Sequence, residues 1–124
     1  MAETMKRLMI VDDSLIIRRR IKREHGLDNY SVVGTASDGE QALSLARQTN
    51  PDLITIDLTM PNMDGIDAIP LISEACPDAR ILVVSALSDK ATAIQALSRG
   101  AHGFLCKPFT DEELKQALQE LAEG

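Results

Sequence analysis

A short apolar segment that ends in an aspartate constrains this chain more than any other feature of its sequence. Residues 53–56 are apolar or β-branched and are followed directly by Asp57. Turn-forming residues flank the segment at 50–52 and at 60–65. A run bounded in this way fits a strand that is buried on both faces, as in a parallel sheet. A carboxylate at the end of such a strand must leave the core and meet water, a cation or a hydrogen-bond donor.

Three further apolar segments end in polar side chains in the same manner. Residues 8–11 precede Asp12 and Asp13, residues 81–84 precede Ser85, and residues 104–106 precede Lys107. If the strands are parallel, their carboxyl ends share one edge of the sheet, where ligand chemistry is usually found. The sequence therefore predicts a site that combines three carboxylates, one hydroxyl and one ammonium.

Helical patterns separate the predicted strands along the whole chain. We expect strands at 7–11, 31–36, 53–56, 81–84 and 104–106, and helices at 15–25, 39–48, 64–75, 90–99 and from 111 onward. Alternation at this spacing, with right-handed crossovers, favours a doubly wound α/β fold with helices on both faces of a parallel sheet. At 124 residues the chain is expected to be one domain, residues 1–124.

Local signals predict where the helices begin. Asp13 or Ser14 is expected to cap the first helix, and Ser88 or Asp89 the fourth. Thr110, followed three residues later by a glutamate, opens the last helix with a capping box.

Other local signals concern helix ends and side-chain burial. Gly26 is expected to end the first helix, and Pro70 either kinks the third helix or delays its start. In the fourth helix we expect Ile94 and Leu97 to face inward, and we expect Cys106 to be buried in the last strand.

Composition and charge exclude several classes of protein. The net charge of −6 argues against nucleic acid as the main partner, because phosphate contacts need a basic surface. No apolar run is long enough to cross a bilayer and the N-terminus lacks a targeting pattern, so we expect a cytoplasmic protein without membrane insertion. The basic run at 18–23 is expected to be mainly a solvated helix face, with docking to an acidic partner surface as the alternative.

The converging carboxylates must deal with their mutual repulsion. Two such charges about 5 Å apart cost on the order of 3 kcal/mol at an effective dielectric near 20, so they share protons or bind a cation. Hard oxygen donors suit Mg²⁺, which leaves positions for phosphate. With Lys107 and Ser85 added, the set fits phosphoryl transfer to Asp57. Taken singly, the acid pair could be only a helix cap, and Ser85 could satisfy a backbone group.

These motifs, taken together and in this order, resemble the receiver domain of bacterial response regulators in two-component and chemotaxis signalling. The matching residues are Asp12-Asp13, the run from Asp57 to Gly65, Ser85-Ala86 and Lys107-Pro108-Phe109. The resemblance covers the whole chain and implies a five-stranded parallel sheet of order 2-1-3-4-5 of flavodoxin type. It implies a phosphoryl group accepted by Asp57 from a histidine kinase or phosphotransfer protein.

The same resemblance implies further roles for named residues. Mg²⁺ would be held by Asp13, Asp57 and the backbone carbonyl of Thr59, with Asp12 acting partly through water. Lys107 would contact the phosphoryl group, and its peptide bond to Pro108 would be cis. Ser85 would move toward the phosphate while Phe104 turns inward, which switches the face made by the fourth helix, the last strand and the fifth helix for a downstream protein target. Many relatives carry Tyr where this chain has Phe104, so the ring here has no hydroxyl and any latch must depend on its packing.

The residues before the last strand bear on which kind of regulator this chain is. Residues 101–104 lack the acidic pair that receivers of winged-helix transcription factors show, which favours a stand-alone or chemotaxis-type regulator. A receiver fragment of a larger regulator is the alternative. A dehalogenase-type phosphatase would need Asp-x-Asp after the first strand, and a flavodoxin-type carrier would need a phosphate loop that the acid pair would repel.

Overall fold

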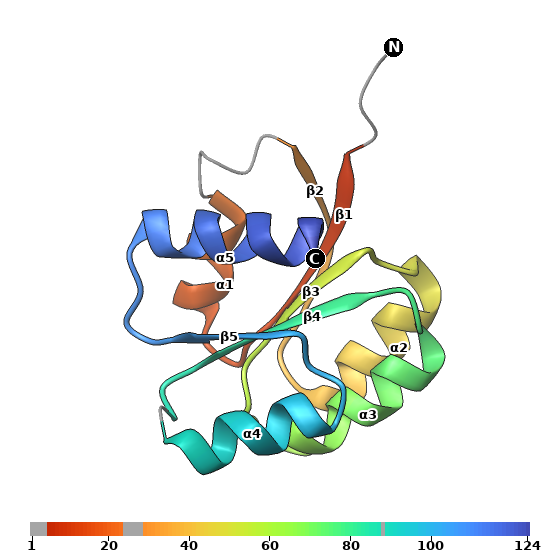
Figure 1. Cartoon of the computed structure of the whole chain (residues 1–124). Helices are drawn as coiled ribbons and strands as arrows, with labels where there is room; N and C mark the ends of the chain where they lie inside the picture. The colour runs from red at the N-terminus through yellow and green to blue at the C-terminus, as the bar shows by residue number, and fades with distance from the viewer. Residues whose placement is uncertain (1–4, 24–28, 88) are drawn as a thin grey trace.

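The computed structural model describes residues 5–23, 29–87 and 89–124. Within these residues, five strands and five helices alternate along the chain (Figure 1). The strands are β1 (Lys6–Val11), β2 (Tyr30–Ala36), β3 (Leu53–Ile56), β4 (Arg80–Ser85) and β5 (Gly103–Cys106). The helices are α1 (Leu15–Arg23), α2 (Gly39–Thr49), α3 (Gly65–Ala75), α4 (Lys90–Ser98) and α5 (Asp111–Glu123). Every predicted element is present, with small differences at the ends.

The strands form one parallel sheet in the order β2-β1-β3-β4-β5, as predicted. After β1 the chain adds β2 on one side, and then crosses to the other side to add β3, β4 and β5. The order therefore reverses between β1 and β3, which is where such sheets place their ligand sites. Asp12 and Asp57 directly follow these two strands.

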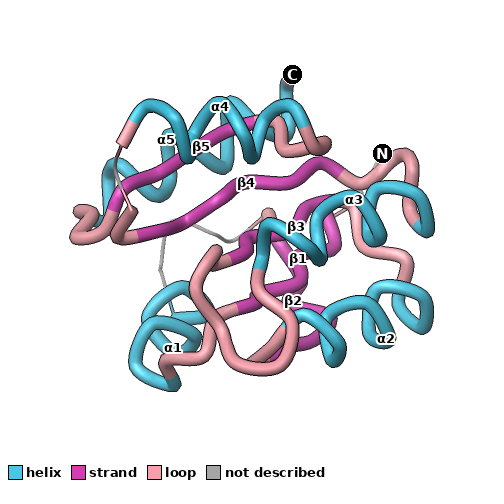
Figure 2. Tube along the Cα trace, turned by 90° about the horizontal axis from the view of Figure 1, so that it is seen from below, coloured by secondary structure: helices cyan, strands magenta, loops and turns pink. Residues whose placement is uncertain are grey.

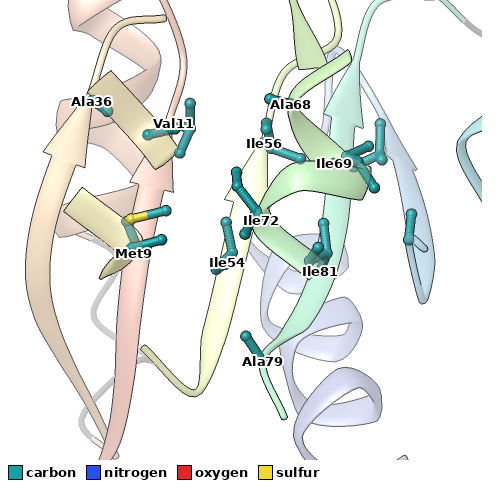
Figure 3. Packing of buried hydrophobic residues seen from close by; sticks show 14 of the residues in the cluster. Met9, Val11, Ala36, Ile54, Ile56, Ala68, Ile69, Ile72, Ala79 and Ile81 are labelled. Carbon is teal, nitrogen blue, oxygen red and sulfur yellow. The ribbon is translucent and has the colours of Figure 1, made fainter. Parts of the chain in front are cut away.

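Two hydrophobic clusters hold the helices against the two faces of the sheet. Viewed from below, α1 and α5 lie on one side of the strands, and α2 and α3 lie on the other (Figure 2). Alternate residues of each strand serve the two clusters: Ile54 and Ile56 pack under α2, α3 and α4, whereas Leu53 packs under α1 and α5. Figure 3 shows the first cluster, in which Ile69 and Ile72 of α3 meet the strand side chains.

The expected orientation of α4 is wrong. Ile94 is 55% exposed and Leu97 is 46% exposed, while Ala96 is fully buried. Helix α4 carries a second apolar pair at the same spacing, Ala93 and Ala96, and the smaller pair faces the sheet. Spacing alone cannot distinguish the two pairs, because both repeat every three residues.

The expected burial of Cys106 is also wrong. Its thiol is free and exposed. Strand β5 lies at the edge of the sheet, and its side chains alternate between the two faces. Leu105 packs in the cluster beneath α5, whereas Cys106 is directed the other way at the last residue of the strand.

The helix caps follow the predictions closely. Ser14 Oγ accepts a hydrogen bond from Ile17 N–H, Asp89 accepts from Thr92 N–H, and Thr110 forms the predicted capping box. Ser88, the other candidate cap, lies outside the described residues, as does Gly26, the expected end of α1.

Pro70 lies inside α3, which begins at Gly65 and continues past the proline to Ala75. The alternative of a later start is therefore wrong. No helix in the described part of the chain combines the length and apolar character needed to span a membrane.

Candidate functional site

Three aspartates meet where β1 and β3 end. One carboxylate oxygen from each of Asp12, Asp13 and Asp57 lies within 4.8 Å of the other two. Asp12 is 1% exposed and Asp57 is 6% exposed, whereas Asp13 is open to solvent. The sheet holds the two buried residues by their backbones, because Asp12 N–H donates to Ala36 O and Asp57 N–H donates to Val11 O. The convergence predicted from the strand ends is present.

Lys107 brings a positive charge to this cluster from the end of β5. Its Nζ lies 2.7 Å from Asp12 Oδ2 and 3.3 Å from Asp57 Oδ2. Its backbone N–H donates to Ser85 O at 2.8 Å, which ties the start of the loop to β4. The cis peptide bond between Lys107 and Pro108, implied by the resemblance, is confirmed.

Burial and neighbouring charges set the protonation states of Asp57 and Lys107. Burial raises the pKa of Asp57, and the neighbouring Asp12 raises it further, while Lys107 and the Thr59 N–H partly oppose the rise. Burial favours the neutral amine of Lys107, but its hydrogen bond to Asp12 and the charges of Asp12 and Asp57 outweigh this, so its pKa is raised. The site therefore keeps Lys107 charged beside Asp57, whose carboxyl group ionises less readily than an ordinary aspartate.

Three other predicted residues surround the cluster. Ser85 is fully buried, and its Oγ accepts a hydrogen bond from Leu87 N–H at 3.0 Å. This is the backbone group that Ser85 was expected to satisfy if its role were only structural. Thr59 is exposed, and its N–H donates to Asp57 Oδ1 at 3.4 Å. Phe104 is half-buried against the cluster beneath α2, α3 and α4. The roles of Ser85 and Phe104 in a switch, and of the Thr59 carbonyl as a ligand, remain predictions.

The loop from β3 to α3 is packed directly against the backbone of Asp57. Gly65 N–H donates to Leu58 O at 2.9 Å, and a Cβ at Gly65 would collide with the carbonyl oxygen of Asp57. Only glycine permits this close approach, which lets α3 begin hard against the end of β3.

A second support for this loop was not anticipated from the sequence. Asp38, the cap of α2, also accepts a hydrogen bond from Asn62 Nδ2 at 2.9 Å. Hydrogen bonds from Gln41 N–H and Asn62 lower the pKa of Asp38. The cap and the Pro61-Asn62 turn are each readable in the sequence, but their contact joins residues 24 positions apart.

The profile of the response regulator receiver domain family matches residues 8–119. This span includes Asp12, Asp13, Asp57, Ser85 and Lys107. The chain belongs to the receiver domain family. The resemblance inferred from the motifs is therefore confirmed, and receiver domains are in general signalling proteins rather than classical enzymes.

This receiver is similar both to chemotaxis proteins and to NarL-type response regulators. It is 38% identical to the chemotaxis protein CheY of Thermotoga maritima, over 94% of this chain and 98% of the relative. The receiver domain of the response regulator NarL from Mycobacterium tuberculosis superposes with a TM-score of 0.91 at 34% identity, over 98% of this chain and 99% of the other. A complex of CheX with CheY, BeF₃ and Mg²⁺ from Borrelia burgdorferi contains a chain that superposes with a TM-score of 0.87 at 31% identity, over 93% of this chain and 87% of the other.

The acid cluster of this receiver has the donor chemistry that Mg²⁺ requires. Receiver domains bind Mg²⁺ at an acidic pocket, and the clustered side chains here offer only carboxylate oxygens. Oxygen donors at this spacing fit a hard divalent cation better than a softer transition metal. The residues present therefore fit the ion that the family implies.

Two arginines of α1 reach the site loops, although the basic run was expected to be mainly a solvated helix face. Arg18 Nη1 donates to Asp12 O at 2.6 Å, and Arg20 Nη2 donates to Phe109 O at 2.6 Å. Arg19, between them, is exposed as expected. The helical period indicates which arginines share a face, but the carbonyl acceptors come from the distant loop geometry.

Proposed function

We propose that this receiver accepts a phosphoryl group on Asp57 from a histidine kinase or a phosphotransfer protein. The observation that carries the proposal is the position of Asp57: it directly follows the central strand β3, it is almost fully buried, and it faces both the acid pair and the Lys107 ammonium. An aspartate with a purely structural role is not expected in this position, because burying a carboxylate beside another carboxylate lowers the stability of the fold.

The transfer is a displacement at phosphorus. A carboxylate oxygen of Asp57 forms the new P–O bond while the P–N bond to the donor histidine breaks, and the electron pair remains on the imidazole nitrogen. Lys107 lies 3.3 Å from Asp57 and supplies positive charge to the phosphoryl oxygens. Bound Mg²⁺ would neutralise charge on the same oxygens, with Asp12 (partly through water), Asp13, Asp57 and the Thr59 carbonyl as its protein ligands. The chain catalyses only this transfer and the later hydrolysis of its own acyl phosphate.

Ser85 is placed to respond to the new phosphoryl group. Its Oγ accepts a hydrogen bond from Leu87 N–H with one lone pair, and the hydroxyl proton can still donate to a phosphoryl oxygen. Movement of Ser85 toward Asp57 vacates volume beside Phe104, and the half-buried ring turns inward to fill it. Phosphorylation then shifts the population between two states of α4, β5 and α5.

Exposed apolar side chains of α4 and of the loop before it support an output surface on this face. Leu87, Ile94 and Leu97 are all at least 45% exposed, and large apolar side chains left on a surface favour a protein partner. We therefore propose that the α4–β5–α5 face binds a downstream protein. With a net charge of −6, the domain itself has no role in binding nucleic acid.

For the pathway, we propose a stand-alone or chemotaxis-type regulator. The similarity to CheY of Thermotoga maritima and the absence of an acidic pair at residues 101–104 support this proposal. A receiver within a larger regulator is the second candidate, supported by the similarity to the NarL receiver. In both cases we propose that residues 1–124 form one phosphoacceptor domain that acts in the cytoplasm without entering a membrane.

Acetyl phosphate tests the proposal without a kinase. Incubation with acetyl phosphate and Mg²⁺ is expected to add the mass of one phosphoryl group to the wild-type chain and none to Asp57→Asn, as measured by intact mass spectrometry. Asp78→Asn, which removes an exposed carboxylate from the loop before β4, is the matched control and is expected to be labelled normally. Full labelling of Asp57→Asn would overturn the proposal.

A further inference from the structure

The side chain of Arg20 joins α1 to the loop that follows β5. Its Nη2 donates to Phe109 O at 2.6 Å, and its guanidinium carbon lies 4.4 Å from the centre of the Phe109 ring. Phe109 is only 4% exposed, so these contacts hold a residue that is already anchored in the core beneath α5. A charge-assisted hydrogen bond and a cation–π contact on the same residue constrain both its backbone and its ring.

The third contact of Arg20 is weaker. Its Nη2 lies 3.2 Å from Asp111 Oδ1, but the two side chains are 34% and 60% exposed. Ion pairs this open to solvent contribute little. The function of Arg20 therefore depends on Phe109.

Phe109 lies two residues after Lys107, and the backbone between them is held at both ends. On one side Lys107 N–H donates to Ser85 O, and on the other side Arg20 holds Phe109 O. Pro108 lies between these anchors and has no N–H with which to make one of its own. Without the Arg20 hydrogen bond, the Phe109 end of this segment would be held only by burial of the Phe109 ring, and its backbone could shift.

The same helix also holds the ion-pair partner of Lys107. Arg18 donates to the backbone carbonyl of Asp12, whose carboxylate lies 2.7 Å from Lys107 Nζ. Helix α1 thus fixes both loops from which the Asp12–Lys107 pair is built. Arg19 lies between the two arginines in sequence, is exposed, and provides a natural comparison.

We infer that Arg20 is a positioning residue for Lys107: it holds the loop at Phe109 so that the ammonium stays against Asp12 and Asp57. The consequence for phosphoryl binding rests on the proposed function, because only then does Lys107 contact the phosphoryl oxygens. The location of the ammonium itself does not depend on that function.

The first readout therefore measures Lys107 in the absence of metal and phosphate. Arg20→Ala and Arg19→Ala remove the same charge from adjacent positions of one helix. Brief reductive methylation followed by peptide mapping is expected to label Lys107 about 3- to 10-fold faster in Arg20→Ala than in wild type, as the loss of one hydrogen bond of ordinary net strength implies. Labelling of Lys90, on the exposed side of α4, is expected to stay unchanged, as is labelling of Lys107 in Arg19→Ala.

The second readout is the affinity for beryllofluoride, a phosphoryl analogue, at saturating Mg²⁺. It is expected to fall about 3- to 10-fold in Arg20→Ala, to fall less in Arg20→Lys, which can still donate to Phe109 O, and to stay unchanged in Arg19→Ala. If Arg20→Ala does not fold, Arg20→Met, which keeps the aliphatic stem against the ring, takes its place.

The outcomes separate the two claims. Equal labelling of Lys107 in Arg20→Ala and Arg19→Ala would overturn the inference, and so would a parallel rise at Lys107 and Lys90, which would indicate general loosening. If wild type fails to bind beryllofluoride, the proposed function fails, while the labelling still decides the role of Arg20.

Discussion

Asp57 and its neighbours place unfavourable charge inside the fold. Burial and Asp12 raise the pKa of Asp57 above its ordinary value of 3.8, so the folded chain holds that proton more tightly than the unfolded chain does. Stability contributed by this group is therefore lost as the pH rises through the raised pKa. At neutral pH the site is a cost to stability that a divalent cation would offset by binding the folded state.

Asp13 allows this cost to be measured, because it belongs to the cluster but is exposed. Asp13→Asn is expected to weaken Mg²⁺ binding and, in metal-free buffer, to raise the free energy of unfolding by up to about 1 kcal/mol, since it removes repulsion that solvent partly screens. Calorimetric titration with Mg²⁺ and thermal unfolding with a chelator check the two effects. Unchanged Mg²⁺ affinity would remove Asp13 from the site.

His102, at the opposite end of the sheet, is expected to make a separate contribution to the pH dependence of stability. Its Nδ1 accepts a hydrogen bond from Ile81 N–H at 3.0 Å, which requires that nitrogen to be unprotonated. Burial and the nearby Arg80 lower the pKa of His102 below its ordinary value of 6.5. A lowered pKa means that the contribution to stability is present above pH 6.5 and is lost as the pH falls through the folded-state value.

His102→Asn is therefore expected to flatten the fall of the melting temperature on the acid side of pH 6.5. The asparagine oxygen can still accept a hydrogen bond but does not titrate. Thermal unfolding between pH 5 and 7, compared with wild type, checks this. An identical acid slope in the two proteins would show that His102 does not titrate with unfolding.

At the scale of elements, the exposed apolar side chains of α4 are expected to contribute little to stability. Ile94 is 55% exposed, whereas Ile72 of α3 is fully buried. Ile94→Ala is expected to change the free energy of unfolding by less than about 0.5 kcal/mol, and Ile72→Ala to lower it by about 2–5 kcal/mol. Denaturant unfolding checks both. A loss at Ile94 as large as that at Ile72 would mean that α4 packs with its larger apolar pair inward.

The elements also show what could be read from the sequence. The strands, the parallel sheet and the polar residues at the strand ends were predicted correctly, because apolar runs with turn signals and the single-handed crossover leave few alternatives. The order of the strands came from the family resemblance, and it is also confirmed. The side of α4 that packs against the sheet was not predicted correctly, because two pairs of apolar residues in this helix have the same spacing of three residues. The Asp38–Asn62 and Arg20–Phe109 contacts could not be read either, since each depends on where separate loops meet.

At the scale of the whole molecule, the site and the proposed output face are joined through β4 and β5. Ser85 and Cys106 are paired at the ends of these strands, and Val83 is paired with Phe104. Beryllofluoride with Mg²⁺ is expected to shift NMR resonances of residues 90–106 as well as those of the Asp57 loop. Ser85→Ala is expected to keep the loop shifts and lose most of the distant ones. Wild-type shifts confined to the loop would place the output on another face.

The central claim is that Asp57 itself carries the phosphoryl group, and chemical trapping tests it most directly. Borohydride reduces an acyl phosphate on aspartate to homoserine, a change that peptide sequencing by mass spectrometry assigns to one residue. After treatment with acetyl phosphate and Mg²⁺, homoserine is expected at position 57 and at none of the neighbouring aspartates, Asp12, Asp13 or Asp64. Homoserine at one of those positions, with Asp57 intact, would contradict the account.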